Sequence, residues 1–206
     1  MKTLTKEIQG KITPDKAVEL LKNGNQRFVQ NLSYNRNLLQ QVNETANGQY
    51  PFATILSCID SRTTAELIFD QGLGDIFSIR IAGNVINDDI LGSMEFACEI
   101  AGSKLIVVLG HTSCGAIKGA CEYVKMAHLT QLLNKVQPAI DQASDNTTVA
   151  PNAPEFIDEV AKINVLNSIN IILKESEVLK QLVEQNKIKI IGGLYDISTG
   201  NVDFLE

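Results

Sequence analysis

The sequence contains no tryptophan, only two histidines and only four cysteines among its 206 residues. It has no cluster of lysine and arginine longer than two residues, and its net charge is −6. A nucleic-acid-binding protein needs a basic face for the phosphate backbone, so we expect no DNA or RNA partner. The longest apolar run, Leu105 to Leu109, is much too short to cross a bilayer.

The amino-terminal segment MKTLTKEIQG lacks the apolar stretch of a secretory signal peptide. We therefore expect no signal peptide, no membrane attachment and a cytoplasmic location. In a reducing compartment, cysteines near a histidine indicate metal binding or catalysis more than disulfides.

Short apolar, β-branched segments alternate with helical patterns along the chain. The expected strands are residues 52–57, 76–81, 105–109 and 188–191. The expected helices begin at Pro14, ending at Gly24, and cover 89–101, 116–125, 154–173 and 177–185, with further helical pattern near Phe28 and Leu129. This alternation is typical of an α/β fold, with a mainly parallel central sheet flanked by helices. We expect one domain over residues 1–206, with a helical arm over about 1–48 and the α/β core over about 49–206.

Polar side chains with metal-binding chemistry follow two of the expected strands. Cys58 comes directly after the first strand, and His111 and Cys114 follow the strand at 105–109. Ligands of parallel sheets bind beyond the carboxyl ends of the strands, so these three side chains should meet there. Two thiolates and one imidazole suit zinc, and three protein ligands leave the fourth position open, as in catalytic zinc sites.

An aspartate and an arginine stand beside the first cysteine, at Asp60 and Arg62. Zinc lowers the pKa of bound water to about 7, which gives hydroxide near neutral pH. Asp60 can accept the hydrogen bond of a zinc-bound hydroxide and orient it toward the substrate. Arg62 can keep Asp60 ionised through a bidentate pair.

The two motifs together resemble the paired signature of the β-class carbonic anhydrases. The first is Cys58-Ile59-Asp60-Ser61-Arg62 and the second is His111-Thr112-Ser113-Cys114-Gly115. Further segments resemble the same family, namely residues 24–28, 78–84 and 193–196, with Ile81 where the family usually has asparagine. The likeness extends from about residue 14 to 204.

This resemblance implies reversible hydration of carbon dioxide to bicarbonate and a proton, with one Zn²⁺ per subunit. It implies Cys58, His111 and Cys114 as zinc ligands and Asp60 with Arg62 as the catalytic dyad. It also implies a substrate pocket at the interface of a homodimer, or of a dimer of dimers. The residues that match its substrate-binding positions are Gln49, Phe77, Phe96 and the backbone N–H of Gly115.

Some members of the family carry a second, inhibitory bicarbonate site made of a tryptophan, an arginine and a tyrosine. Arg80 and Tyr195 match two of these positions, but Ile55 stands where the tryptophan is found. We therefore expect the open form, in which Asp60 does not displace water from zinc.

Three other functions stay open at this point. The same scaffold supports hydrolysis of carbon disulfide or carbonyl sulfide, a zinc-binding protein without turnover would use the same ligands, and Cys114 with His111 would suit a cysteine nucleophile. Outside the motifs, we expect Cys98 and Cys121 to be core residues and His128 to lie on a surface helix.

Overall fold

A computed structural model describes residues 3–146 and 149–205 of the chain. A single five-stranded sheet lies at its centre, in the order β2-β1-β3-β4-β5. Strands β1 to β4 run parallel and β5 is antiparallel to β4. The strands are β1 Ala53–Ser57, β2 Ile76–Arg80, β3 Leu105–His111, β4 Lys189–Tyr195 and β5 Val202–Leu205. The expected α/β fold with a mainly parallel sheet is confirmed.

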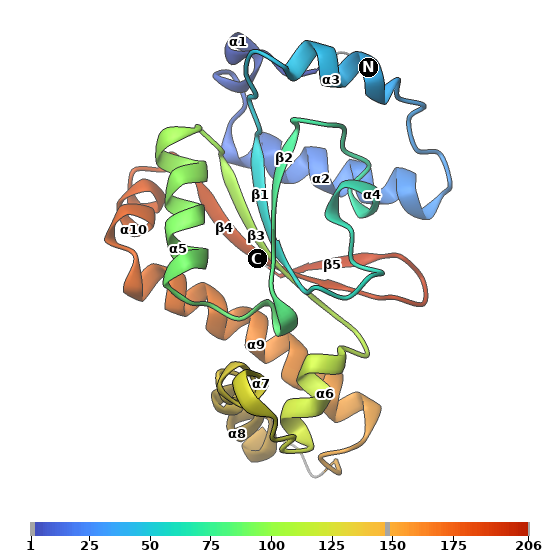
Figure 1. Ribbon diagram of the computed structural model, residues 1–206, viewed down its shortest axis with the longest axis vertical. Helices are drawn as coiled ribbons and strands as arrows, with labels where there is room; N and C mark the ends of the chain where they lie inside the picture. Colours follow the sequence, from blue (N-terminus) through green and yellow to red (C-terminus); the bar gives the residue numbers. More distant parts are fainter. Residues whose placement is uncertain (1–2, 147–148, 206) are drawn as a thin grey trace.

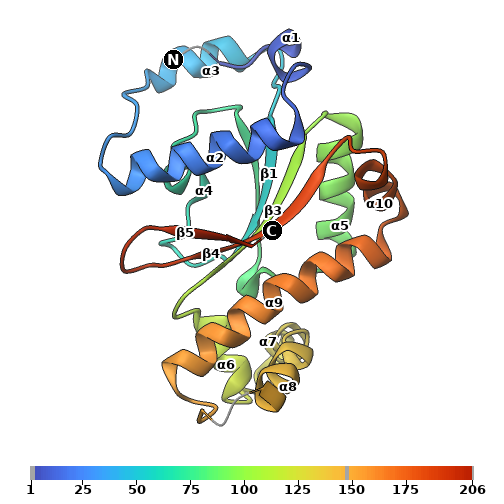
Figure 2. The same cartoon turned by 180° about the vertical axis from the view of Figure 1, so that it is seen from behind.

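Helices cover both faces of this sheet (Figures 1 and 2). They are α1 Lys6–Gln9, α2 Pro14–Val29, α3 Leu38–Thr45, α4 Ala65–Ile68, α5 Asp88–Glu95, α6 Gly115–Cys121, α7 Ala127–Asn134, α8 Gln137–Asn146, α9 Pro154–Glu175 and α10 Glu177–Glu184. A 3₁₀ turn, η1 Ala82–Asn84, precedes α5, and a π-helical turn, η2 Phe96–Ile100, extends it. In the described ranges no helix is both long and apolar enough to span a bilayer.

The central strand β3 shows why the sheet needs helices on both faces. Its seven residues are all buried, and its side chains alternate between two apolar layers. Leu105, Val107 and Leu109 pack with α2 and α4 on one face. Ile106 and Val108 pack with α5, α9 and α10 on the other. The helices α6, α7 and α8 gather with the start of α9 below the strands in Figure 1.

Helix α2 begins as expected but ends later than the sequence suggested. Thr13 caps it by accepting a hydrogen bond from the Lys16 N–H, and Pro14 occupies the first turn. The prediction that Gly24 ends the helix was wrong, since the helix continues to Val29. A Cβ at Gly24 would lie 1.8 Å from the carbonyl oxygen of Phe69, so this glycine permits close packing of α2 on the α4 segment.

The carboxyl end of the sheet also differs from expectation. Strand β4 continues through Gly192 and Gly193, and the short edge strand β5 was not predicted. A Cβ at Gly192 would lie 2.7 Å from Cγ1 of Val165 in α9. Gly192 therefore lets α9 approach the strand closely, whereas a Cβ at Gly193 would meet Leu109 and Val202, and neither glycine ends the strand.

The order of the strands determines where a site can form. From β1 the chain moves to β2 at one edge, and then crosses to β3 on the opposite side of β1. The carboxyl ends of β1 and β3 thus flank a topological switch point, where open α/β sheets bind their ligands. Cys58 directly follows β1, and His111 is the last residue of β3.

Candidate metal centre

Three buried donor side chains meet at the switch point. Cys58, His111 and Cys114 each offer one ligating atom, and these atoms all lie within 4.8 Å of one another. The two sulfur atoms are 3.9 Å apart. A tetrahedral ion with two sulfurs at about 2.3 Å needs them about 3.8 Å apart, so the observed spacing fits zinc.

The imidazole of His111 is oriented for ligation by Nε2. Its Nδ1 lies 2.9 Å from the carbonyl oxygen of Thr112, which assigns the proton to Nδ1 as the donor. Within the described part of the chain, the buried Nε2 has no hydrogen-bond partner. A buried nitrogen without a partner is costly, and a metal ion would satisfy it.

The electrostatics of the two thiols also favour a cation. The hydrogen bond from Cys114 lowers the pKa of Cys58 to about 4, although burial opposes this shift. The same hydrogen bond, together with burial, raises the pKa of Cys114 because its thiolate would form beside the Cys58 thiolate. Two adjacent buried thiolates are therefore stable only with a positive charge between them.

Backbone and side-chain hydrogen bonds hold the loop that carries Cys58. The hydroxyl of Thr63 donates to the carbonyl oxygens of Cys58 and Asp60, at 3.0 and 2.9 Å. Arg80 Nε donates to the Cys58 carbonyl oxygen at 3.0 Å. From the sequence, Arg80 was expected only at the second bicarbonate site, and neither its hydrogen bond to the Cys58 loop nor those of Thr63 were predicted. No sequence signal marks either contact, because both depend on how the loop folds back.

Asp60 and Arg62 form the expected bidentate pair. Arg62 Nε and Nη2 donate to Oδ1 and Oδ2 of Asp60, at 2.9 and 2.8 Å. The hydrogen bonds from Arg62 hold the pKa of Asp60 well below its usual range. The Asp60 side chain is 17% exposed and that of Arg62 is 50% exposed. The Asp60 carboxylate therefore faces the Arg62 guanidinium.

An open cavity of about 480 Å³ lies beside the sulfur cluster, with a largely apolar lining. Cys58, Asp60 and Gly115 all line it, as do Ala82, Ala116 and Leu129. A Cβ at Gly115 would meet no atom within 4 Å, so space in this chain does not require a glycine there. Asp60 and the amino-terminal end of α6 therefore border one common cavity.

The other three expected substrate residues lie elsewhere in the chain. Gln49 is exposed and precedes β1, so the strand, about 16 Å long, lies between it and Cys58. Phe77 pairs with Thr54 near the start of β1, and its ring packs against Phe96 with centroids 6.4 Å apart. The structure therefore brings Gly115 to the metal centre, but not these three side chains of the same chain.

The remaining cysteines and the second histidine lie outside the cluster, as predicted. Cys98 and Cys121 are buried in the core, and burial raises the pKa of Cys98 to about 12. His128 is exposed on α7.

Comparisons with known proteins agree with this geometry. The sequence model of the family described as carbonic anhydrase matches residues 53–202. "Carbonic anhydrase 2" of Mycobacterium tuberculosis is 34% identical over 191 residues, which cover 91% of this chain and 90% of that protein.

Solved structures share the fold. The β-carbonic anhydrase CafA of Aspergillus fumigatus matches with a TM-score of 0.74 at 25% identity, over 82% of this chain and 81% of that one. One of two tetrameric β-carbonic anhydrases from Sordaria macrospora matches with a TM-score of 0.71 at 24% identity, over 78% and 83% of the two chains. With both signature motifs converging at the switch point of this fold, the chain belongs to the carbonic anhydrase family, in its β class.

Proposed function

We propose that this protein catalyses the reversible hydration of carbon dioxide to bicarbonate and a proton, at a zinc ion held by Cys58, His111 and Cys114. The observation that carries the proposal is the buried three-donor cluster, with a bidentate Asp60–Arg62 pair and an apolar cavity beside it. Membership of the carbonic anhydrase family supports the reaction class.

The donor set supports a catalytic metal site rather than a structural one. Among the described residues, three donors make up the cluster, whereas structural zinc sites close the fourth position with a protein ligand. A zinc ion held by these three residues would lower the pKa of a coordinated water to about 7 and so would supply the nucleophile near neutral pH. Because both sulfurs must remain reduced, the site suits a reducing compartment such as the cytoplasm.

Asp60 and Arg62 have separate tasks in this proposal. Asp60 accepts the hydrogen bond of the attacking oxygen and so directs its lone pair at the carbon of carbon dioxide. Arg62 donates two hydrogen bonds to the carboxylate, which keeps Asp60 ionised and fixes its orientation. Asp60 therefore stays ionised, and able to accept a hydrogen bond, at pH values well below the usual pKa of an aspartate.

The cavity suits a substrate without net charge. Its largely apolar lining suits carbon dioxide, which has no net charge and therefore enters without losing the hydration shell of an ion. The N–H of Gly115, at the start of α6, is available to donate to an oxygen of the product bicarbonate. Attack of a hydroxide oxygen on carbon would form one C–O bond while the electron pair of one C=O π bond moves to its oxygen, which gives bicarbonate. The proton that water lost in becoming hydroxide passes to solvent.

We assign the other three expected substrate residues, Gln49, Phe77 and Phe96, to the substrate site of a second copy of the chain. Three large apolar side chains are exposed. Phe96, which is 55% exposed, and Ile100 lie in η2, and Ile59 directly follows Cys58. A dimer that buries them would bring Gln49, Phe77 and Phe96 to the partner's cavity.

Mixed dimers test this assignment. Co-expressed Cys58→Ser and Gln49→Ala chains form dimers in which one site has an intact metal cluster and receives Gln49 from the other chain. We expect these dimers to recover about half of the wild-type activity per dimer, whereas each homodimer is impaired. No recovery in purified mixed dimers would show that Gln49 does not act across the interface.

Stopped-flow measurement of carbon dioxide hydration tests the activity itself. We expect hydration that is lost when a chelator removes zinc and restored when zinc is added back. Cys58→Ser should abolish it, and the core variant Cys121→Ser, which leaves the cluster intact, should retain it. Full hydration activity in a sample shown to be free of metal would refute the proposal. The same samples assayed with carbon disulfide distinguish the alternative hydrolase.

A further inference from the structure

Helix α9 contacts the metal centre at two points that the reaction scheme does not use. It is the longest helix among the described residues, and it passes beneath the carboxyl ends of the strands in Figure 1. Two of its polar side chains, Asp158 and Asn164, hydrogen-bond to backbone groups next to the metal ligands. We propose that Asn164 and Asp158 are positioning residues of the metal centre.

Asn164 holds the backbone that contacts the first sulfur. Its Nδ2 donates to the carbonyl oxygen of Gly83 at 2.9 Å. The N–H of the same glycine points at Cys58 Sγ, at 3.4 Å. An N–H directed at a thiolate stabilises its charge and fixes the direction of its lone pairs. Asn164 thus acts on Cys58 through Gly83.

The backbone that Asn164 holds is in a conformation that needs support. Gly83 has φ +67° and Asn84 has φ +44°, so two successive residues occupy the left-handed region. A residue other than glycine in this region persists only when its surroundings fix it. The hydrogen bond from Asn164 is one such constraint.

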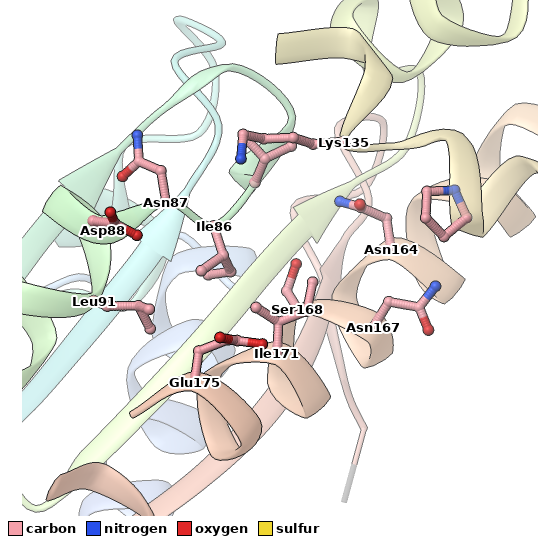
Figure 3. Close-up of a pocket in the computed structure, with 12 residues that line it drawn as sticks. Ile86, Asn87, Asp88, Leu91, Lys135, Asn164, Asn167, Ser168, Ile171 and Glu175 are labelled. Atoms are coloured by element: carbon pink, nitrogen blue, oxygen red, sulfur yellow. The ribbon is translucent and has the colours of Figure 1, made fainter. Parts of the chain in front are cut away.

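The burial of Asn164 shows that its amide has a specific task. The side chain is 4% exposed and lies between the buried neighbours Ile163 and Val165. A buried amide without hydrogen bonds would destabilise the fold, so its bond to Gly83 accounts for its place in an apolar helix face. Figure 3 shows Asn164 on the wall of an open cavity of about 370 Å³ between α9 and the start of α5.

Asp158 contacts the turn that carries the other two metal ligands, His111 and Cys114. Its Oδ1 accepts a hydrogen bond from the N–H of Ser113 at 2.7 Å. Ser113 lies between His111 and Cys114 and has φ +53°, again in the left-handed region. The turn that presents both ligands from one loop is therefore fixed from α9 as well.

The two contacts together tie the ligands to one rigid element. Cys58 and the His111–Cys114 turn come from separate strand ends, and α9 is hydrogen-bonded to the backbone next to each. Partners that orient metal ligands typically change metal affinity by about 10–100-fold when they are removed. We therefore expect loss of either contact to speed release of zinc.

Matched variants on the same helix test the role of Asn164. Asn164→Ala removes the donor, and Asn164→Asp keeps the volume but replaces the donor with an acceptor. Asn167→Ala is the control, because Asn167 lines the same cavity but its amide points to the opposite side from that of Asn164 in Figure 3. Zinc release from the holoprotein into excess chromophoric chelator should be at least about 10-fold faster in both Asn164 variants, and within about twofold of wild type in the control.

A conservative replacement separates a hydrogen bond from a charge effect at Asp158. Asp158→Ala should also release zinc about 10-fold faster, whereas Asp158→Asn retains an oxygen acceptor for Ser113 and should release it at nearly the wild-type rate. Glu159→Ala, on the exposed side of the same turn, is the control. If Asp158→Asn behaves like Asp158→Ala, the hydrogen bond is not what positions the turn.

A spectroscopic readout separates positioning from general destabilisation. In cobalt-substituted protein, the thiolate-to-cobalt charge-transfer band should shift in the Asn164 variants and remain unchanged in Asn167→Ala. If Asn164→Ala does not fold, the isosteric Asn164→Asp and the half-buried Asp158 position still test the proposal.

This inference depends on the proposed metal site, so zinc content of the wild-type protein is measured first. Wild-type protein that binds no zinc would refute the proposed function. Zinc-loaded Asn164 variants with wild-type release rates and an unchanged cobalt spectrum would refute the positioning role alone.

Discussion

Replacing Asp60 by asparagine separates a catalytic carboxylate from an ordinary surface salt bridge. In the wild-type protein Arg62 donates to both oxygens of Asp60, at 2.8 and 2.9 Å. Asparagine keeps one oxygen acceptor, but it presents an amide N–H₂ group to Arg62 or to the attacking oxygen. The variant therefore loses the negative charge and one of the two acceptor oxygens, while the volume of the side chain is nearly unchanged.

The expected loss of activity follows from the proposed role of the Asp60 carboxylate, which accepts a hydrogen bond from the attacking oxygen. A positioned group that accepts a hydrogen bond in the transition state contributes about 10²–10⁴-fold to rate. Because one acceptor oxygen remains, we expect kcat/KM for carbon dioxide hydration to fall by about 10²–10³-fold.

The effect on stability should be small, since half of the Arg62 side chain is exposed. Exposed ion pairs contribute little to folding, so the melting temperature should fall by no more than about 2–4 °C. Zinc content should remain at one ion per chain, because Asp60 is not among the three clustered donors.

Stopped-flow hydration, zinc analysis and thermal unfolding of one preparation measure all three quantities. The control is Glu122→Gln, which neutralises another carboxylate on the same cavity, paired with Lys118. It should leave the rate within about threefold of wild type. Nearly wild-type activity in Asp60→Asn, with full zinc content, would refute the catalytic role of the carboxylate.

Three further predictions concern glycine packing, a buried ion pair and the ionisation of Asp60. Gly24→Ala should destabilise the protein by about 3 kcal/mol or more in urea unfolding, because its Cβ would overlap the Phe69 carbonyl, whereas Gly92→Ala in the open middle of α5 should not destabilise it. Asp70→Asn should lower the free energy of unfolding by about 3–5 kcal/mol, because it leaves the cations of Arg27 and Arg36 beside a neutral amide. Burial alone would raise the pKa of Asp70, but the hydrogen bonds from these two arginines outweigh burial and lower the pKa. This cost should be present above the ordinary aspartate pKa of about 4 and shrink as pH falls below it, as urea unfolding at several pH values will show; a constant cost would contradict the argument. Arg62→Gln should raise the pKa of Asp60 toward about 4, measured by carbon-13 NMR titration of the carboxyl group, and an unchanged pKa would show that Arg62 is not the cause of its depression.

Three of the strands and the residues of the Cys58–His111–Cys114 cluster could be predicted from the sequence, because both have strong local signals. Continuous apolar runs bounded by turns marked β1, β2 and β3, and the loops after two of them carried Cys58 and His111. The topological switch point then required these loops to meet. The resemblance to the β-class carbonic anhydrases, which depends on the same two motifs, indicated the same residues.

Glycines were the main source of error in the fold. Gly24 was expected to end a helix, and the last strand was expected to stop at Ile191, before Gly192 and Gly193; yet all three glycines lie inside elements. A glycine that ends a helix and a glycine that permits close packing look the same in one sequence, because only the neighbouring element distinguishes them. The four-residue strand β5 was missed for a related reason, since it is defined mainly by pairing with β4.

Residues that hold the site from a distance could not be predicted either. Asn164 in a helical pattern has no local feature that distinguishes it from the neighbouring asparagine Asn167. Its contact with Gly83 joins residues 81 positions apart. The converse case is a set of residues that the family resemblance places at the site although they lie away from the metal cluster of their own chain. These residues are Gln49, Phe77 and Phe96.

X-ray absorption at the zinc edge of the purified protein shows whether Cys58, His111 and Cys114 hold a zinc ion. We expect one zinc ion per chain with two sulfur scatterers at about 2.3 Å and two nitrogen or oxygen scatterers at about 2.0–2.1 Å, and loss of one sulfur in Cys58→Ser. Protein that takes up no zinc, or a zinc ion whose sulfur count does not change in Cys58→Ser, would contradict this expectation.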